Sequence, residues 1–260
     1  MGSAYAAQMK AVLSRSLDPG RVVDLAHDLP AHGVAEAAFV VRAMASGFPA
    51  GTVHVVVVDP GVGGRRAPIL LATRDGSLLL GPDNGVLYPL AERLGVGRAY
   101  RIEPERLGAR GRVGTTFDGR DLFAPAAAAL ANGRRPEELG RLYRPHRYSI
   151  PEPHRTPRGA AGEVVHVDRF GNLITNVPAD WVPSGVRTVD LRVGPARGGR
   201  LPFTSSYEAL GRGRSGLLGS SFGTVEVAVG EGRADRRYRA RVGAGVHIAW
   251  AKPRRRRVRA

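Results

Sequence analysis

The sequence predicts an α/β N-terminal domain with a mostly parallel central sheet, followed by a C-terminal all-β, barrel-like domain. An apolar run, HVVVV at 54–58, has no polar alternation, which predicts a strand that is buried on both faces. Segments with helical and strand-like spacing alternate through the first half of the chain, as in α/β domains. The second half holds short β segments separated by Gly, Ser and Pro, which is typical of small barrels and sandwiches.

The first half divides into elements by its apolar spacing. Helices are predicted over 4–17, 33–45, 86–94 and 121–132, and strands over 21–25, 55–58, 68–73 and 78–80. Asp75-Gly76 lies between the last two strands and predicts a hairpin.

The second half contains five predicted strands, at 164–167, 173–175, 186–193, 216–218 and 225–229. We therefore expect an α/β domain over 1–140, a Pro- and Arg-rich linker over 141–161, a β domain over 162–251 and a basic, disordered tail over 252–260.

Charge and composition exclude several classes of function. The formal charge of +16 is typical of nucleic-acid binding, but the basic residues other than Lys10 and Lys252 are arginines, a bias that genome composition produces. Six positive charges lie in the tail KPRRRRVR at 252–259, for which we expect only weak, salt-sensitive polyanion binding. The absence of cysteine excludes disulfides and thiolate sites, and with no apolar run of membrane-spanning length and no visible signal peptide, cytosol is the expected location.

Polar residues follow the valine run at once. Pro60 and Gly61 end the strand, so Asp59 is expected at its carboxyl end, where open α/β sheets bind ligands. Arg66 follows seven residues later. The alternative is that Asp59 caps the turn while the arginines face solvent.

Four further motifs have the form of polar turns, namely GPDNG at 81–85, TTFDGRD at 115–121, DRFGNLITN at 168–176 and GSSFGTVE at 219–226. Each alone is an ordinary turn. Together with the valine run and in this order, they resemble the S-adenosyl-L-methionine (SAM) hydroxide adenosyltransferase family, relatives of the fluorinases and chlorinases. The resemblance extends from about Tyr5 to His247.

The resemblance implies a fold and an activity. Members of the family have an α/β domain and a β-barrel domain, and typically form a homotrimer with sites between one subunit's N-terminal domain and a neighbour's C-terminal domain. They hydrolyse SAM to adenosine and L-methionine by attack of water on the ribose C5′, with no metal or cofactor.

The resemblance also assigns residues to the reaction. Asp59 and Arg66 match an Asp and an Arg that activate the water. Asp118 stands where the family has a histidine, and we expect it to act as a substitute base, with weakened activity as the alternative. Two carboxylates in one pocket repel, which is expected to raise the pKa of one of them, an effect that Arg66 moderates.

Six residues match the family's substrate contacts. These are Asp168 and Asn172 for ribose and methionine, Tyr207 for stacking on adenine, and Ser221, Glu226 and Val229 in the adenosine-contacting stretch. A core tyrosine is the alternative for Tyr207.

Two alternative functions remain open. One is a non-catalytic relative that binds adenosine or SAM, and the other is a SAM-dependent halogenase, although Asp59 and Asp118 would repel a halide. Family members also open with a strand ending in a Thr-Asp-Phe-Gly-like motif, whereas this chain opens with MGSAYAAQMK. A start codon placed too late and a truncation both explain this. The exposed sheet edge that a truncation leaves favours the first.

Overall fold

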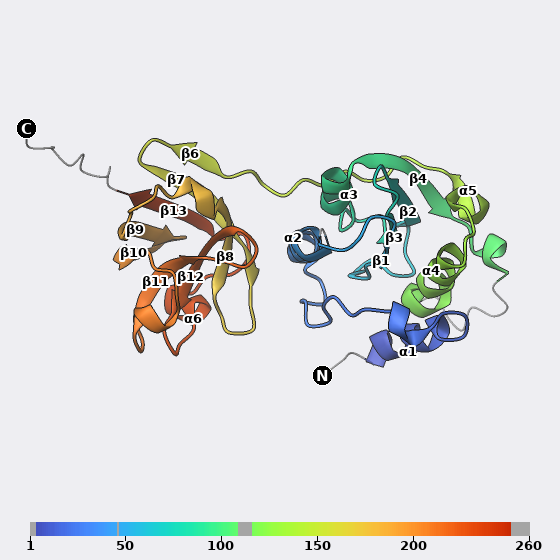
Figure 1. Cartoon of the computed structure of the whole chain (residues 1–260), viewed down its shortest axis with the longest axis horizontal. Helices are drawn as coiled ribbons and strands as arrows, with labels where there is room; N and C mark the ends of the chain where they lie inside the picture. Colours follow the sequence, from blue (N-terminus) through green and yellow to red (C-terminus); the bar gives the residue numbers. More distant parts are fainter. Residues whose placement is uncertain (1–3, 46, 109–115, 251–260) are drawn as a thin grey trace, which may run out of the picture. The chain divides into compact units, whose positions relative to one another are not determined.

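The computed structural model describes residues 4–45, 47–108 and 116–250. The chain forms two compact units, Met1–Ile150 and Pro151–Ala260 (Figure 1). Within the described residues, no helix has the length and apolar character that crossing a membrane requires. The predicted basic tail lies outside the described residues. The range 141–161, predicted as a linker, contains part of strand β5, all of β6 and the start of β7.

A five-stranded sheet forms the centre of the first unit. Its strands are β1 (Val53–Val55), β2 (Pro68–Thr73), β3 (Leu78–Pro82), β4 (Val96–Ile102) and β5 (Gly140–Leu142), in the order β1-β3-β2-β4-β5. Among the pairs that the described residues form, β1 and β3 alone run parallel. The prediction of a mostly parallel sheet is therefore wrong. The predicted hairpin at Asp75-Gly76 is present, and it makes β2 and β3 antiparallel because so short a connection reverses the chain.

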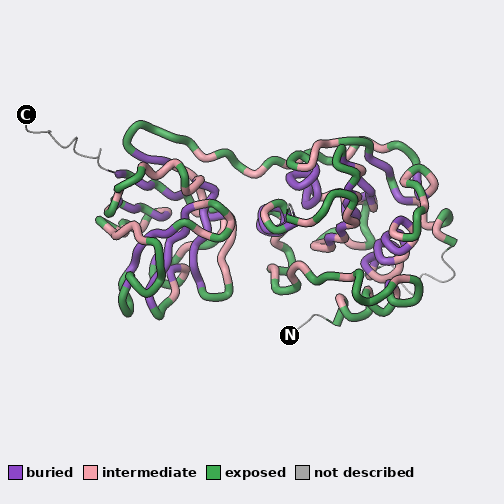
Figure 2. Tube along the Cα trace, in the orientation of Figure 1, coloured by how far each residue is buried: buried purple, intermediate pink, exposed green. Residues whose placement is uncertain are grey.

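Helices cover both faces of this sheet (Figure 1). The helices α2 (Val34–Ala45) and α3 (Tyr88–Leu94) pack on one face, and α4 (Ala124–Ala131) packs on the other, against which α1 (Ala4–Leu13) lies. Within the valine run, Val55 faces α4 and Val56 faces α2. The valine run is thus covered on both faces because β1, a short strand at the edge of the sheet, lies between two layers of helices. The buried segments of the unit lie in these inner layers (Figure 2).

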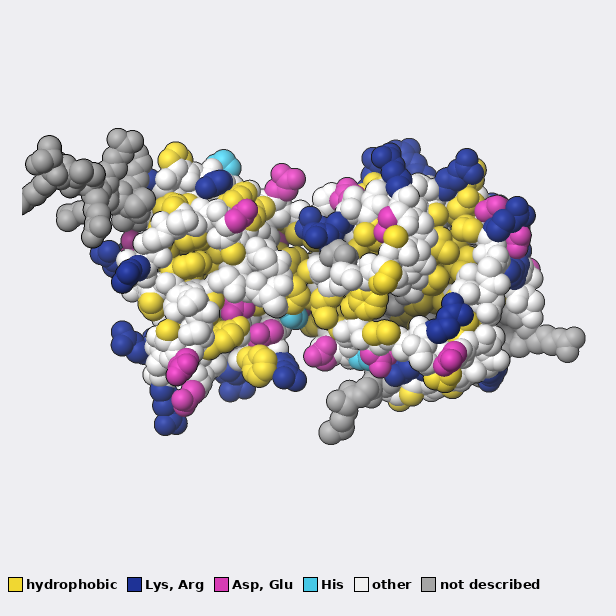
Figure 3. Space-filling view, in the orientation of Figure 1, with side chains coloured by type: hydrophobic (Ala, Val, Ile, Leu, Met, Phe, Trp, Pro, Cys, Tyr) yellow, Lys and Arg dark blue, Asp and Glu magenta, His cyan; other side chains and the backbone are white. Residues whose placement is uncertain are grey.

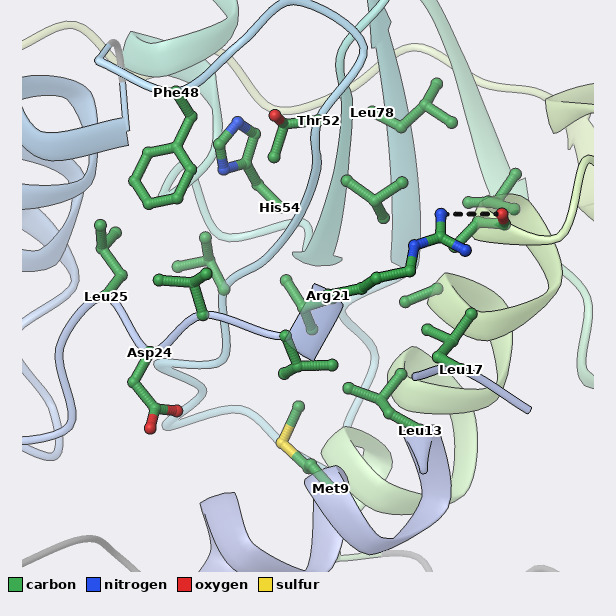
Figure 4. A pocket seen from close by; sticks show the side chains of 18 of the residues that line it. Met9, Leu13, Leu17, Arg21, Asp24, Leu25, Phe48, Thr52, His54 and Leu78 are labelled. Atoms are coloured by element: carbon green, nitrogen blue, oxygen red, sulfur yellow. Dashed lines mark hydrogen bonds between the residues drawn. The ribbon is translucent and has the colours of Figure 1, made fainter. Parts of the chain in front are cut away.

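A cavity of about 490 Å³ lies beside β1 and is lined by this strand and by residues 21–27, among others. Figure 4 shows its wall of Met9, Leu13 and Leu17 on one side and Phe48 and His54 on the other. Residues 22–26, which border it, form no strand, so the predicted strand at 21–25 is wrong. A strand needs a neighbour that accepts and donates hydrogen bonds, and here the cavity separates this segment from β1.

The second unit is a nearly closed antiparallel barrel. Its strands are β6 (His154–Thr156), β7 (Gly159–Val167), β8 (Leu173–Pro178), β9 (Thr188–Val193), β10 (Ala196–Pro202), β11 (Ser215–Gly219), β12 (Thr224–Val229) and β13 (Gly245–Trp250). They follow the order β10-β9-β13-β7-β8-β12-β11, with β6 on β7. A bridge between Phe203 and Leu217 links the two ends of that order. The barrel-like domain that the sequence predicts is confirmed.

Short helical segments complete the fold. They are η1 (Pro19–Arg21), η2 (Pro104–Leu107), the π-helical turn η3 (Gly119–Phe123), α5 (Pro136–Leu139), η4 (Ala179–Trp181), η5 (Glu208–Leu210) and α6 (Ala234–Tyr238). On the face drawn in Figure 3, Lys and Arg side chains lie in small groups among Asp and Glu on each unit. This face therefore carries no continuous basic stripe of the kind that tracks a nucleic-acid backbone.

Candidate active site

Asp59 and Arg66 meet across the loop that follows β1. Arg66 donates from Nε to both carboxylate oxygens of Asp59, at 3.0 and 2.9 Å, and from Nη2 to Oδ2. Gly61 allows the close return of the loop, because a Cβ there would lie 3.3 Å from Cγ of Arg66. The two residues thus form a paired carboxylate and guanidinium, a geometry that fixes both planar groups.

Asp118 completes the cluster from a different element. It directly precedes η3, the turn that leads into α4, and its Oδ2 accepts a hydrogen bond from Nη2 of Arg66. The side chains are only 3% exposed for Asp59, 2% for Asp118 and 11% for Arg66. The structure therefore brings together the three residues to which the sequence assigns the reaction. Thr115 of the same motif lies outside the described residues.

The cluster holds one cation between two carboxylates. Burial alone would lower the pKa of Arg66, but the hydrogen bonds and charges of Asp59 and Asp118 outweigh it and raise that pKa. The guanidinium is therefore permanently charged, and each carboxylate has a strong donor on one side. Carboxylate oxygens offer several lone pairs, so both retain capacity to accept a hydrogen bond from a water molecule.

A cavity of about 560 Å³ adjoins the cluster. Arg66 and Asp118 line it together with the polar residues Arg65, Arg101, Glu103, Glu105 and Arg141. Space of this size and polarity admits water to the carboxylate of Asp118. The apolar cavity of about 490 Å³ beside β1 contains none of the three reactive candidates among its lining residues.

Two of the predicted substrate residues lie in one turn of the second unit, between β7 and β8. Asp168 accepts hydrogen bonds from the backbone N–H groups of Phe170 and Asn172, both at 2.9 Å, and from Nδ2 of Asn172 at 3.0 Å. Asp168 thus shapes the turn and fixes the Asn172 amide. Asp235 supports the same turn, since its backbone N–H donates to the carbonyl of Gly171 at 2.9 Å.

Tyr207 and Glu226 form a second contact in this unit. The Tyr207 hydroxyl donates to Oε1 of Glu226, whose residue is only 3% exposed. Burial raises the pKa of the Glu226 carboxyl, the Tyr207 hydrogen bond opposes that rise, and the charge of Asp168 adds to it. Tyr207 is about half exposed, so the alternative of a core tyrosine is wrong.

The remaining two predicted substrate residues lie apart from this pair. Ser221 is exposed in the turn that precedes β12, and Val229 lies at the far end of that strand. The side chain of Val229 packs in the barrel core with Val225 and Val227, whereas Glu226 points to the opposite face of the strand. A contact of Val229 with a ligand on the Glu226 face would therefore have to come from its backbone.

Sequence reasoning gave the GPDNG motif no role beyond a turn. In the structure, Nδ2 of Asn84 donates to the carbonyl of Val58 at 2.8 Å, immediately before Asp59. The position of this motif could have suggested a role near Asp59, because the motif overlaps the end of β3, the strand that pairs with β1. Nothing along the chain identifies β3 as the neighbour of β1, because the hairpin at Asp75-Gly76 indicates only the pairing of β3 with β2.

Comparisons with known proteins find relatives that match both units of the chain. The model of the SAM hydroxide adenosyltransferase N-terminal domain matches residues 1–140, and that of the C-terminal domain matches residues 162–247. An (R)-S-adenosyl-L-methionine hydrolase from Thermus thermophilus is 38% identical over 237 residues, 88% of each chain. Its counterpart from Methanocaldococcus jannaschii is 34% identical over 173 residues, which span 66% of this chain and 59% of that protein.

More distant and structural relatives point the same way. A fluorinase from Actinopolyspora mzabensis is 25% identical over 205 residues, 68% of each chain. The crystal structure of an uncharacterized conserved protein from Thermotoga maritima superposes with a TM-score of 0.85 at 32% identity, covering 95% of both chains. With both of its domains matched, this chain belongs to the SAM hydroxide adenosyltransferase family.

Proposed function

We propose that this protein hydrolyses S-adenosyl-L-methionine to adenosine and L-methionine. The observation that carries the proposal is the buried Asp59–Arg66–Asp118 cluster in a member of this family. A hydrolase needs a site that orients one water molecule and accepts its proton, and buried carboxylates fixed by a guanidinium meet both needs.

The reaction is a displacement at the ribose C5′. The water oxygen forms a bond to C5′ as the bond from C5′ to sulfur breaks, and the bonding electron pair stays on sulfur. The sulfonium thereby becomes the neutral thioether of methionine, which leaves without protonation. The proton of the attacking water passes to a carboxylate and then to solvent.

Each member of the cluster has a distinct part in this proposal. Asp59 orients the water and accepts its proton, and Arg66 holds Asp59 in one orientation through its paired hydrogen bonds. Asp118 takes the place of the family's histidine as a second acceptor, reached from the adjoining polar cavity.

The second unit contributes substrate contacts. Asn172, with Asp168 behind it, binds the ribose and methionine portion, and Tyr207 offers its half-exposed ring to adenine. Glu226 lies against the Tyr207 hydroxyl, and Ser221 and Val229 flank the same stretch of chain.

We further propose a homotrimer in which the reactive cluster of one subunit faces the second unit of a neighbour. Light scattering would give the mass of the assembly, and a monomer would contradict this part. Refolded mixtures of Asp59→Asn with Asn172→Ala should recover activity that neither variant has alone, because some mixed sites then carry both intact residues.

The halogenase alternative differs in its nucleophile. A carboxylate and a halide ion at contact range repel each other by about 1 to 4 kcal/mol in water-like to surface-like dielectric, so water suits the cluster better. The binding-protein alternative differs in yielding no product.

One experiment separates the three functions. Purified protein is incubated with SAM, with and without chloride or fluoride, and products are separated by chromatography beside a heat-denatured control. Adenosine and methionine formed without halide support the hydrolase. A halide-dependent 5′-halo-adenosine supports the halogenase, and calorimetric binding with no adenosine above the control supports the binding protein.

A further inference from the structure

The two ends of the loop that carries Asp59 and Arg66 are both held by one turn, Asp83-Asn84. The backbone N–H of Asp83 donates to the carbonyl of Ala67 at 2.8 Å, directly after Arg66. The side chain of Asn84 donates to the carbonyl of Val58 at 2.8 Å, directly before Asp59. This turn comes from the GPDNG motif, to which the proposed function assigns nothing.

The Asn84 contact continues the β1–β3 ladder by other means. The backbone N–H of Leu78 donates to the carbonyl of Thr52, which lies 26 residues earlier in the chain. Nδ2 of Asn84 donates to the carbonyl of Val58, also 26 residues earlier, so this side chain occupies a later donor position in the same register. Between them, Pro82 has no N–H to offer Val56. Gly81 lets the strands stay close here, since a Cβ on it would lie 2.4 Å from the Val56 carbonyl oxygen.

Other contacts hold the turn itself in place. Asp83 accepts hydrogen bonds from the Tyr143 hydroxyl at 2.8 Å and from the backbone N–H of His146 at 2.7 Å. Oδ1 of Asn84 accepts from the N–H of Val86 at 3.2 Å, which fixes the amide so that Nδ2 faces Val58. These contacts therefore fix the direction in which Nδ2 of Asn84 donates.

We propose that Asn84 is a positioning residue for the reaction: its amide fixes the Val58 carbonyl and so aims the Asp59 carboxylate. This inference rests on the proposed function. β1 ends at Val55, and the Asn84 amide holds the chain three residues further on, at the carbonyl directly before Asp59. A shift of about 1 Å in a reacting group lowers rates by up to roughly a hundredfold, so a small rotation at Val58 has a large effect.

The test is Asn84→Asp, which keeps size and the acceptor for Val86 but puts an anionic oxygen against the Val58 carbonyl. We expect kcat to fall by about 10- to 100-fold with KM for SAM changed no more than a few-fold. In an Asp59→Asn background, the same change should lower kcat no further, because the group that it positions is already lost.

The matched control is Asn132→Ala, which also removes an Asn amide that donates to a loop carbonyl, that of Ser16, at 3.4 Å. It should leave kcat unchanged. An Asn84→Asp variant with wild-type kcat, or with a change in KM alone, overturns the inference, as does an equal loss of kcat in the control.

Hydrogen exchange separates a failure of this inference from a failure of the proposed function. Amides of residues 59–66 should exchange faster in Asn84→Asp, while those of β2 and β4 remain protected as in the wild type. If the wild type forms no adenosine, the proposed function fails and the exchange of this loop still decides whether Asn84 holds it. Unchanged exchange there overturns the inference.

Discussion

Two buried carboxylate sites in this molecule have opposite surroundings. In the first unit, Asp59 and Asp118 share the guanidinium of Arg66. In the second unit, Glu226 has a phenol hydroxyl as its hydrogen-bond partner, and burial raises the pKa of its carboxyl. A cation favours the charged form of an acid, whereas burial beside a neutral donor favours the uncharged form more than water does.

This difference in surroundings suits the carboxyl groups of the two sites to different roles. Charged carboxylates accept a proton and orient water, so the Arg66 cluster suits the chemical step. A carboxyl without a cation that accepts a hydrogen bond from a tyrosine suits recognition of polar atoms on a ligand. Under the proposed function, the residues that react have a cation beside them, and the carboxyl that contributes to recognition has a neutral hydroxyl instead.

Removing the charge of Asp59 should break this contrast most strongly. Asp59→Asn keeps the shape but loses the proton acceptor, so kcat should fall by about 10²- to 10⁴-fold. Binding of SAM, measured by calorimetry on the same preparation, should persist. An unchanged kcat would refute the assignment of Asp59.

Removing the cation should destabilise the fold. Arg66→Met leaves two buried carboxylates without their counterion, for which we expect a loss of about 3–5 kcal/mol in the free energy of unfolding by denaturant titration. Arg120→Met is the control, since Arg120 also forms a paired contact with an aspartate, Asp121, but lies nearer to solvent and should matter far less. Equal losses in the two variants would contradict the importance of burial.

Asp118 tests the departure from the family's histidine. Asp118→Asn keeps one acceptor oxygen but loses the charge. We expect kcat to fall by about 10- to 100-fold, which corresponds to the free energy of one hydrogen bond to a charged group. Asp118→His should stay within about tenfold of the wild type. A histidine variant as inactive as the asparagine variant would show that the site requires an anion at this position.

Glu226 sharpens the contrast through pH. Because its pKa is raised in the folded state, that state holds the proton more tightly, and the stability it contributes is present at low pH and lost as pH rises through the folded pKa. Glu226→Gln stays neutral, so its melting temperature relative to that of the wild type should rise as pH increases above the ordinary pKa of a glutamate. A difference in melting temperature that does not vary with pH would contradict a raised pKa.

Several features of the site could be predicted from the sequence because they are local. The apolar run followed by Asp59-Pro60-Gly61 predicted a carboxylate close to the end of a strand. The predicted bounds of 55–58 are wrong, because β1 spans Val53–Val55 and ends four residues before Asp59. The order of the motifs identified the family, and with it Arg66 and Asp118. These predictions rest on spacing along the chain.

Features that depend on pairing could not be predicted in this way. A run of valines fits a central strand of a parallel sheet. It fits equally well a short strand at the edge of a sheet that is covered by helices on both faces, as β1 is, so the pattern cannot distinguish the two. The inward orientation of Val229 follows from the register of β12, and the role of Asn84 follows from the parallel pairing of β1 and β3. Register is set by contacts between distant segments.

The central claim is that water held at the Asp59–Arg66–Asp118 cluster attacks C5′ of SAM. Its most direct test is turnover in water enriched with oxygen-18, followed by mass spectrometry of the nucleoside. We predict adenosine that carries one heavy oxygen in its 5′-hydroxyl group, and loss of that product in Asp59→Asn. Adenosine without the label, or labelled adenosine formed equally by Asp59→Asn, would contradict the account.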